Sequence, residues 1–208
     1  LRFAVGVIAE YSLYEIGYLF NDFFTVKKEL NPNHRLPPEK REKIEKYFIQ
    51  ITAARITIVI LSIIYLKSQL FTAALAFIGV AFALHNSIRS RWNILTYFLL
   101  CFGKYLALPA LFVPGRLGEA CLVLVLAFVL PRTIEHASKP KYRVSFLKSL
   151  EPHPFRAIYA LLLALAAAVF APASLLFFVA LWYYVYRVLV LSALLLFGDP
   201  RKKPSPQQ

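Results

Sequence analysis

The stretch IQITAARITIVILSIIYL, residues 49–66, decides the fold class. Arg55 is its single charged residue, and almost every other position is apolar or carries a small hydroxyl. At 1.5 Å of rise per residue, a helix over these residues is about 27 Å long, close to the roughly 30 Å thickness of a bilayer's hydrocarbon core. The stretch therefore predicts a membrane-spanning helix.

Other stretches have the same character, and together they predict seven spans. Hydrophobic residues make up 59% of the 208 residues and charged residues only 17%, which excludes an ordinary soluble enzyme and a disordered chain. We predict an all-α, polytopic transmembrane helical bundle. The six further spans are expected at 2–20, 69–86, 92–112, 116–131, 155–171 and 173–197. We expect residues 1–200 to form one domain, with cap loops at 21–48, 85–91 and 132–154, a short helix over 37–47, and a disordered tail at 201–208.

The distribution of basic residues predicts the orientation of the bundle. The net charge of +13 resembles that of a nucleic-acid-binding protein, but most Lys and Arg residues fall in the three cap loops and the tail. The opposite side holds Arg2, Lys67 and Arg116. This bias follows the positive-inside rule, so the cap loops are expected in the cytoplasm of a plasma or bacterial inner membrane, with Leu1 outside and a further span upstream. Topology and anionic lipid explain the charge, and no nucleic-acid partner is expected.

A few ionisable residues fall inside the expected spans, where a charge is costly and usually faces a cavity or a partner. Arg55 and Glu119 lie near span ends and are expected to reach water. Lys104 and Arg187 lie deeper, which favours a cavity or an internal ion pair, and Glu15 could pair with either of them or line a cavity. The histidines have no metal-ligand spacing and are expected to be solvated loop residues: His34, His85, His136 and His153.

The densest polar cluster, NDFFTVKKELNPNHRLP at 21–37, follows the first span. Its oxygen-bearing side chains share roughly one face if the helix continues beyond the membrane: Asn21, Asp22, Thr25 and Glu29. Mg²⁺ prefers a few carboxylates, waters and phosphate oxygens, so this face could bind a Mg²⁺–diphosphate. A plain helix end followed by a polar, proline-stopped loop explains the same residues.

The cluster resembles the first aspartate-rich motif of the UbiA prenyltransferase superfamily, NDxxDxxxD followed by an Arg-Pro-like stretch. Thr25 and Glu29 replace the second and third aspartates, and no aspartate lies between Asp22 and Asp199 to form the family's second motif. Further segments resemble, in order, the polyprenyl-phosphate phosphoribosyltransferase branch: HNSIRSR at 85–91, GKYLA at 103–107, LPRTIE at 130–135 and YVYRVLV at 184–190.

The resemblance implies a helical bundle around a cavity in which a diphosphate is held through Mg²⁺ at a cytoplasmic polar cap. The metal ligands it implies are Asn21, Asp22, Thr25 and Glu29. The catalytic residues it implies are Asp22, Lys104, Glu135 and Arg187, with Glu135 either orienting a basic residue or binding a second ion. The substrate-binding residues expected alongside them are Glu15, Tyr18, Arg35, Asn86, Arg89 and Arg132.

The reaction that the resemblance favours is phosphoribosyl transfer from phosphoribosyl diphosphate to a polyprenyl phosphate, with release of diphosphate. The expected partners are therefore membrane lipid, an isoprenoid phosphate or diphosphate, and a small second substrate. Three alternatives stay open. The chain could transfer a prenyl group from a prenyl diphosphate to an aromatic or other small acceptor, it could bind lipid phosphate without catalysis, or it could be a transporter.

Overall fold

A computed structural model describes residues 1–25, 37–88, 90–142, 144, 147, 150–172 and 174–198, with the side chain of Pro38 left out. The described residues form helices, turns and short irregular segments, with no strand among them. Seven of these helices are long and apolar enough to cross a membrane. This confirms the all-α, polytopic prediction. The spans are Arg2–Thr25, Phe48–Leu66, Gln69–Ser87, Asn93–Phe112, Pro114–Ala137, Pro152–Phe170 and Leu175–Phe197.

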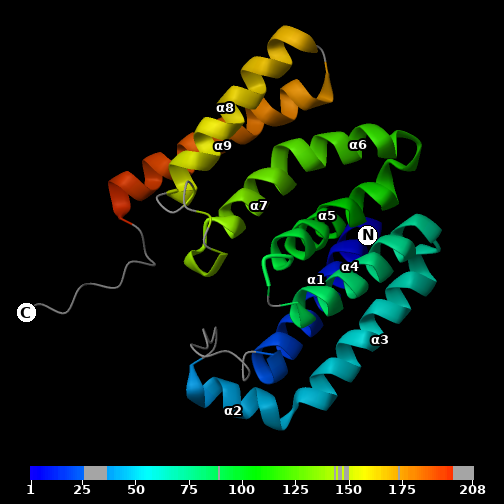
Figure 1. Ribbon diagram of the computed structural model, residues 1–208. Helices are drawn as coiled ribbons and strands as arrows, with labels where there is room; N and C mark the ends of the chain where they lie inside the picture. Colours follow the sequence, from blue (N-terminus) through cyan, green and yellow to red (C-terminus); the bar gives the residue numbers. More distant parts are fainter. Residues whose placement is uncertain are drawn as a thin grey trace, which may run out of the picture. The chain divides into compact units, whose positions relative to one another are not determined.

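The chain divides into two compact units, Leu1–Leu124 and Val125–Gln208, and each is described by itself. In the first unit, the long helix α1 packs against α3, α4 and α5, and α4 and α5 form a hairpin (Figure 1). Its elements are α1 (Arg2–Phe20), the π-helical turn η1 (Asn21–Thr25), α2 (Pro38–Lys46), α3 (Phe48–Leu66), α4 (Gln69–Ser87), α5 (Asn93–Phe112), the 3-10 turn η3 (Pro114–Arg116) and α6 (Leu117–Leu124).

One end of the first unit is tied together by backbone carbonyl and hydroxyl groups. The Arg2 guanidinium donates a hydrogen bond to the carbonyl of Leu66, 3.1 Å away, so α1 begins where α3 ends. Lys67 ends α3 with a positive φ of 50°, and the Ser68 hydroxyl caps α4 by accepting from the Phe71 amide. Arg2 and Lys67 therefore lie at the same end of the unit, as the charge pattern predicts.

The opposite half of α1 lies very close to α4 because Gly17 has no side chain. A Cβ atom at Gly17 would lie 2.5 Å from the ring of Phe82. Asn86 donates from its amide to the Gly17 carbonyl at 3.3 Å, and Tyr14 packs edge-on against Phe82, with ring centroids 4.7 Å apart. The Tyr14 hydroxyl also donates to the carbonyl of Leu100 on α5. These contacts fix the rotation of α1, and with it the direction of its polar residues.

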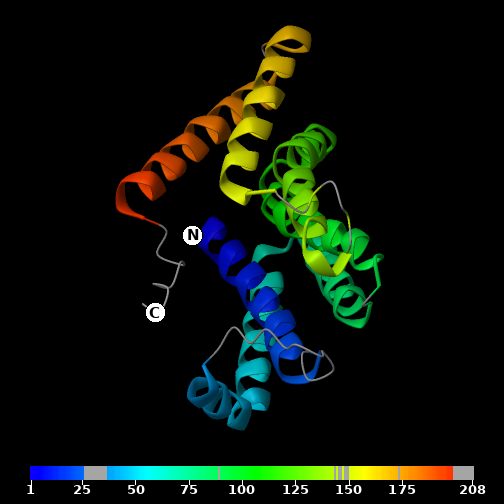
Figure 2. The ribbon, with the colours of Figure 1, turned by 60° about the vertical axis from the view of Figure 1, so that its left-hand side comes forward.

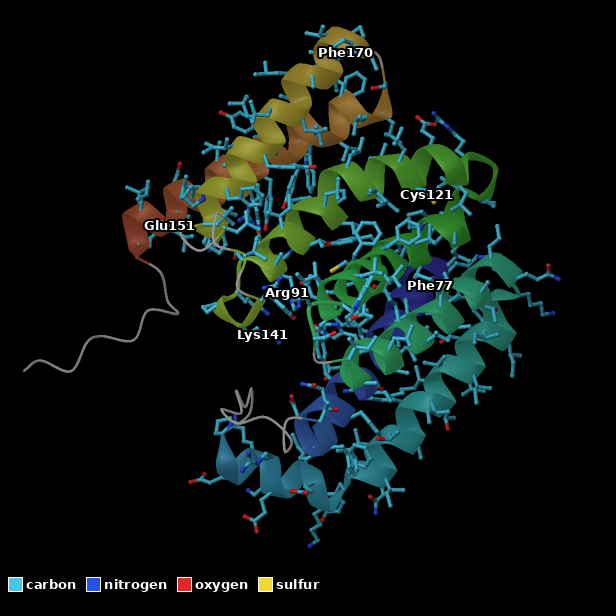
Figure 3. The ribbon with its side chains drawn as sticks, viewed as in Figure 1. Phe77, Arg91, Cys121, Lys141, Glu151 and Phe170 are labelled. Atoms are coloured by element: carbon cyan, nitrogen blue, oxygen red, sulfur yellow. The ribbon has the colours of Figure 1, made fainter. Side chains whose placement is uncertain are left out.

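The second unit is built on a hairpin of α8 (Pro152–Phe170) and α9 (Leu175–Phe197), seen from another side in Figure 2. Figure 3 labels Glu151 and Phe170 at the two ends of α8. Four buried alanines at alternating three- and four-residue spacing let α9 approach closely, as small residues do between membrane helices: Ala157, Ala160, Ala164 and Ala167. The π-helical turn η4 (Val125–Val129), α7 (Leu130–Ala137) and the 3-10 turn η5 (Pro140–Tyr142) precede this hairpin.

Replacing Gly17 with alanine is expected to destabilise the first unit, because the Phe82 ring has to move to admit the new methyl group. Overpacking of this kind costs about 1–3 kcal/mol. Gly79 is the matched control. It lies on α4, in the groove between α1 and α4, but an added Cβ there would have no atom within 4 Å. Thermal unfolding in detergent should show a lower midpoint for Gly17→Ala and not for Gly79→Ala; equal midpoints would contradict the close packing.

Candidate functional site

The polar cluster at 21–25 continues α1 as a π-helical turn rather than as a regular α-helix. The Thr25 hydroxyl donates to the carbonyl of Phe20, 3.5 Å away, and both Asp22 and Thr25 are buried. Single π-turns inside α-helices occur frequently at functional sites. The turn changes the angular positions of these side chains from those of an uninterrupted helix, and Glu29, the fourth proposed metal ligand, lies outside the described residues.

The donor atoms in this turn fit a Mg²⁺ ion that is bound mainly by a substrate's phosphates. Asp22 supplies a carboxylate that is 3% exposed, and Asn21 supplies an amide oxygen. Among the described residues, no three His, Cys, Asp or Glu side chains gather as a metal site. Mg²⁺ commonly takes only one or two protein carboxylates and completes its shell with phosphate oxygens and water, so such a sparse set remains suitable.

A groove of about 830 Å³ runs between α1 with η1 and α4. Most of its wall is apolar, but Thr25, Asn86 and Ser87 lie together at one end, where η1 and α4 both finish. Between Leu13 and Thr25 the groove follows about 18 Å of helix. The full lining is Leu13, Ile16, Gly17, Phe20, Phe24, Thr25, Gly79, Phe82, Ala83, Asn86 and Ser87. Its shape and polarity fit an elongated ligand with one polar end.

A second, much smaller cavity of about 40 Å³ lies within the first unit beside Lys104. It is lined by Glu10, Tyr11, Tyr14, Glu15, Tyr18 and Lys104. The Lys104 ammonium lies 4.7 Å from the centre of the Tyr14 ring and 5.8 Å from that of Tyr11, within cation–π range. Glu10 is buried and interacts electrostatically with Lys104. The aromatic faces and this carboxylate stabilise a charge that would otherwise be costly at this depth.

The structure pairs the remaining charges of α1 and α3 differently from the sequence prediction. Glu15 forms an ion pair with Arg55, with 4.0 Å between the carboxylate and guanidinium atoms. Sequence reasoning expects Arg55 to reach water, and for Glu15 it offers an ion pair with Lys104 or Arg187 or a place on a cavity wall. Glu15 does line the small cavity beside Lys104. Only the tertiary contact of α1 with α3 reveals the Arg55 pair, because the two residues are far apart in the chain. Glu119 pairs with Arg116 one helical turn away, at 2.6 Å.

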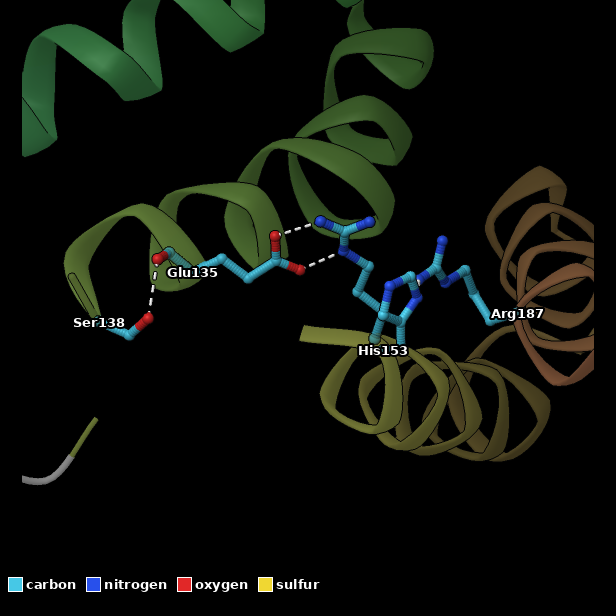
Figure 4. A network of polar contacts seen from close by, with 5 residues as sticks. Glu135, Ser138, His153 and Arg187 are labelled. Carbon is cyan, nitrogen blue, oxygen red and sulfur yellow. Dashed lines mark hydrogen bonds and ion pairs between the residues drawn. The ribbon is translucent and has the colours of Figure 1, made fainter. Parts of the chain in front are cut away.

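The second unit contains a cluster of arginines around one carboxylate (Figure 4). Arg156 donates to both carboxylate oxygens of Glu135, and the Ser138 hydroxyl donates to the Glu135 carbonyl at 2.8 Å. One terminal nitrogen of Arg187 donates to His153 Nδ1 at 3.1 Å. Arg187 is 6% exposed, and the charges of Arg156 and Arg132 act on it. The cluster thus joins the last turn of α7 and the first turns of α8 to the interior of α9.

The prediction that the histidines are solvated loop residues is wrong for His136. This side chain is buried, and its Nε2 lies 2.6 Å from the hydroxyl of Tyr142. His85 is half-buried beside Thr96, with 3.2 Å between its Nδ1 and the hydroxyl. His153 is also half-buried and holds Arg187. These partners lie on other elements, Tyr142 on η5, Thr96 on α5 and Arg187 on α9, so local polarity in the sequence does not reveal them. His34 lies outside the described residues.

The predicted site residues therefore gather in three places. Glu15, Tyr18 and Lys104 surround the small cavity, and Thr25 and Asn86 line the groove. Glu135, Arg132 and Arg187 belong to the arginine cluster of the second unit. Glu29, Arg35 and Arg89 lie outside the described residues.

The sequence analysis did not predict several polar residues of these sites, and the sequence contains a signal for only some of them. Tyr11 and Tyr14 were missed, although they repeat at helical spacing with the predicted Glu15 and Tyr18 and mark one face of α1, a signal present in the sequence. No comparable local signal identifies Arg156 and His153, because their partners lie on α7 and α9.

No protein-family model matches the chain, and no curated protein and no solved structure matches it significantly.

Lys104 and Glu10 are expected to be energetically coupled. Removing the ammonium with Lys104→Met leaves the buried Glu10 carboxylate uncompensated, which should lower stability by on the order of 2–3 kcal/mol. Adding Glu10→Gln to that variant should recover most of the loss. Thermal unfolding of the two single variants and the double variant forms a double-mutant cycle. Strictly additive effects would show that the two groups do not interact.

Proposed function

We propose that this chain is an integral-membrane, Mg²⁺-dependent transferase that joins an isoprenoid substrate to an acceptor with release of diphosphate. The proposal starts from the resemblance of residues 21–37 and of the later segments to the UbiA superfamily. It is supported by the groove between α1 and α4, which is the observation that carries it.

The groove suits the two chemical parts of an isoprenoid phosphate or diphosphate. An isoprenoid tail is apolar and long, and burying it against the apolar wall is favourable in proportion to the area covered. The phosphate end needs hydrogen-bond donors, and the Asn86 amide, which gives one of its two protons to the Gly17 carbonyl, can supply the other at this end of the groove. That end adjoins the Asn21–Asp22 pair, since Thr25 belongs to the same π-helical turn.

Within this proposal, Asp22 and Asn21 hold the metal ion. Mg²⁺ bound there neutralises the negative charge that develops on a departing diphosphate. The burial of Asp22 excludes water from the carboxylate and strengthens its electrostatic interaction. Thr25, whose hydroxyl already donates to the Phe20 carbonyl, keeps its oxygen lone pairs for a metal-bound water or a phosphate-bound proton.

Among transferase reactions, we favour phosphoribosyl transfer to a polyprenyl phosphate. In this reaction a phosphate oxygen of the lipid bonds to the anomeric carbon of ribose, and the bond from that carbon to diphosphate breaks. Because both substrates carry phosphate, the enzyme needs more cationic groups than a prenyl transfer to a neutral acceptor does. The intramembrane cations Lys104 and Arg187 therefore favour phosphoribosyl transfer over prenyl transfer.

A chain that binds lipid phosphate without catalysis is the second candidate. Two observations favour it: Thr25 stands where the family motif has an aspartate, and Arg156 occupies both carboxylate oxygens of Glu135.

Purified protein incubated with labelled phosphoribosyl diphosphate and a polyprenyl phosphate is expected to form a labelled lipid only when Mg²⁺ is present. Asp22→Asn should reduce the rate at least about 100-fold, because a lost metal ligand removes charge stabilisation in the transition state. Glu119→Gln, at the other end of the first unit, is the control and should be unaffected. Turnover that survives Asp22→Asn would overturn the metal site, and lipid binding without turnover would favour the second candidate.

Filling the groove provides an independent test. Gly79 lines the groove and has open space where a Cβ would be, so Gly79→Phe should occupy the groove without a clash. Gly118 on α6 also has open space and does not line the groove, which makes Gly118→Phe the matched control. We expect Gly79→Phe to raise the KM for the isoprenoid substrate about tenfold or more while thermal stability is kept. An unchanged KM would place the lipid elsewhere.

A further inference from the structure

Arg187 of the second unit is a buried cation whose hydrogen-bonding capacity is only partly used. It lies inside α9, ten residues before the helix ends at Phe197, and is 6% exposed. One of its terminal nitrogens donates to His153, but its Nε atom is buried and has no hydrogen-bond partner among the described residues. A buried donor left without an acceptor costs about 1–3 kcal/mol, and more when the group is charged.

The neighbouring side chains do not supply the missing negative charge. Glu135 is the carboxylate of this cluster, and Arg156 already engages both of its oxygens. Arg132 and Arg156 both add positive charge around Arg187. A guanidinium can only donate hydrogen bonds, so His153 must accept at Nδ1 and contributes no negative charge. Because Arg156 and Glu135 neutralise each other, the contacts described for Arg187 leave its positive charge without a carboxylate.

We propose that this arginine cluster binds a phosphate monoester directly, without a metal ion. A phosphate monoester carries close to two negative charges near neutral pH and would supply the acceptor oxygens and negative charge that the described contacts of Arg187 lack. Its oxygens are acceptors only, and arginine binds them in the planar, two-pronged geometry that Arg156 already uses with Glu135. The unused Nε of Arg187 supplies one of the donors.

The cluster replaces a second metal site rather than completing one. Metal binding needs carboxylates with open lone pairs, whereas Glu135 is neutralised by Arg156. The resulting site holds a phosphate by charge and hydrogen bonds alone. This inference does not depend on the proposed transferase activity, because binding can be measured with Mg²⁺ removed and no second substrate present.

The test uses the full chain in detergent with excess EDTA, and measures binding by calorimetry. The probes are geranyl phosphate, geraniol and inorganic phosphate, followed by the chain in phosphatidylcholine nanodiscs with or without phosphatidic acid. We expect geranyl phosphate to bind about tenfold or more tightly than geraniol, which has no phosphate for the arginine cluster and can use only the apolar groove of the first unit. Comparable binding of inorganic phosphate would assign the site to free phosphate, and stabilisation by phosphatidic acid would assign it to lipid headgroups in general. Failure of every phosphate probe without Mg²⁺ would overturn the proposal.

We expect two variants to change phosphate binding in opposite directions, which a purely structural role of the two residues does not predict. Arg187→Met should weaken geranyl phosphate binding about tenfold or more, because it removes a charge-assisted donor. Glu135→Gln should tighten binding, because it releases Arg156 and raises the net charge of the cluster. Arg116→Met, an exposed arginine in the first unit, is the matched control and should change nothing. If Arg187→Met fails to fold, the Glu135→Gln variant alone tests the proposal. Geranyl phosphate binding to Glu135→Gln that is weaker than, or equal to, binding to the unchanged chain would contradict the phosphate site.

Discussion

The cost of placing a charge in hydrocarbon governs how this chain is built. Few ionisable side chains fall inside its spans, and the structure gives each of the deep ones a specific neighbour. Lys104 lies against the faces of Tyr11 and Tyr14, Glu15 pairs with Arg55, and Arg187 donates to His153. These contacts offset the free-energy cost of charged side chains inside helices that otherwise face lipid. They also hold fixed the side chains from which a binding site could be made.

The two units carry different chemistry. The first combines an apolar groove with a buried carboxylate, Asp22, in the same π-helical turn as the groove residue Thr25, and the proposed function assigns these to a lipid tail and a metal-bound phosphate. The second concentrates positive charge around Glu135, and its buried Arg187 Nε has no acceptor in the described part of the chain. A transferase with two phosphate-bearing substrates needs both kinds of site, since like-charged substrates cannot be held by one cation alone. Each unit can be tested for its own ligand.

Hydropathy was sufficient to predict the seven spans to within six residues at each end, because a membrane helix must be continuous and apolar. The site was less predictable. The π-helical turn at Asn21–Thr25 has no distinctive sequence, and the pairing of Glu135 with Arg156 joins residues separated by a long loop. The sequence predicts a solvated loop position for His136, but in the structure its ring forms a hydrogen bond with the Tyr142 hydroxyl. The tyrosine face of α1 was open to prediction from its spacing, whereas the roles of Glu29, Arg35 and Arg89 remain predictions.

The most direct test of the central claim is a cryo-electron microscopy map of the full chain in nanodiscs with a polyprenyl phosphate, Mg²⁺ and a non-reactive analogue of phosphoribosyl diphosphate. The account predicts tubular density along the groove from Leu13 to Thr25, with a metal peak within about 2.1 Å of an Asp22 oxygen. Ordinary phospholipid in the groove and no metal near Asp22, under conditions that saturate both ligands, would contradict it.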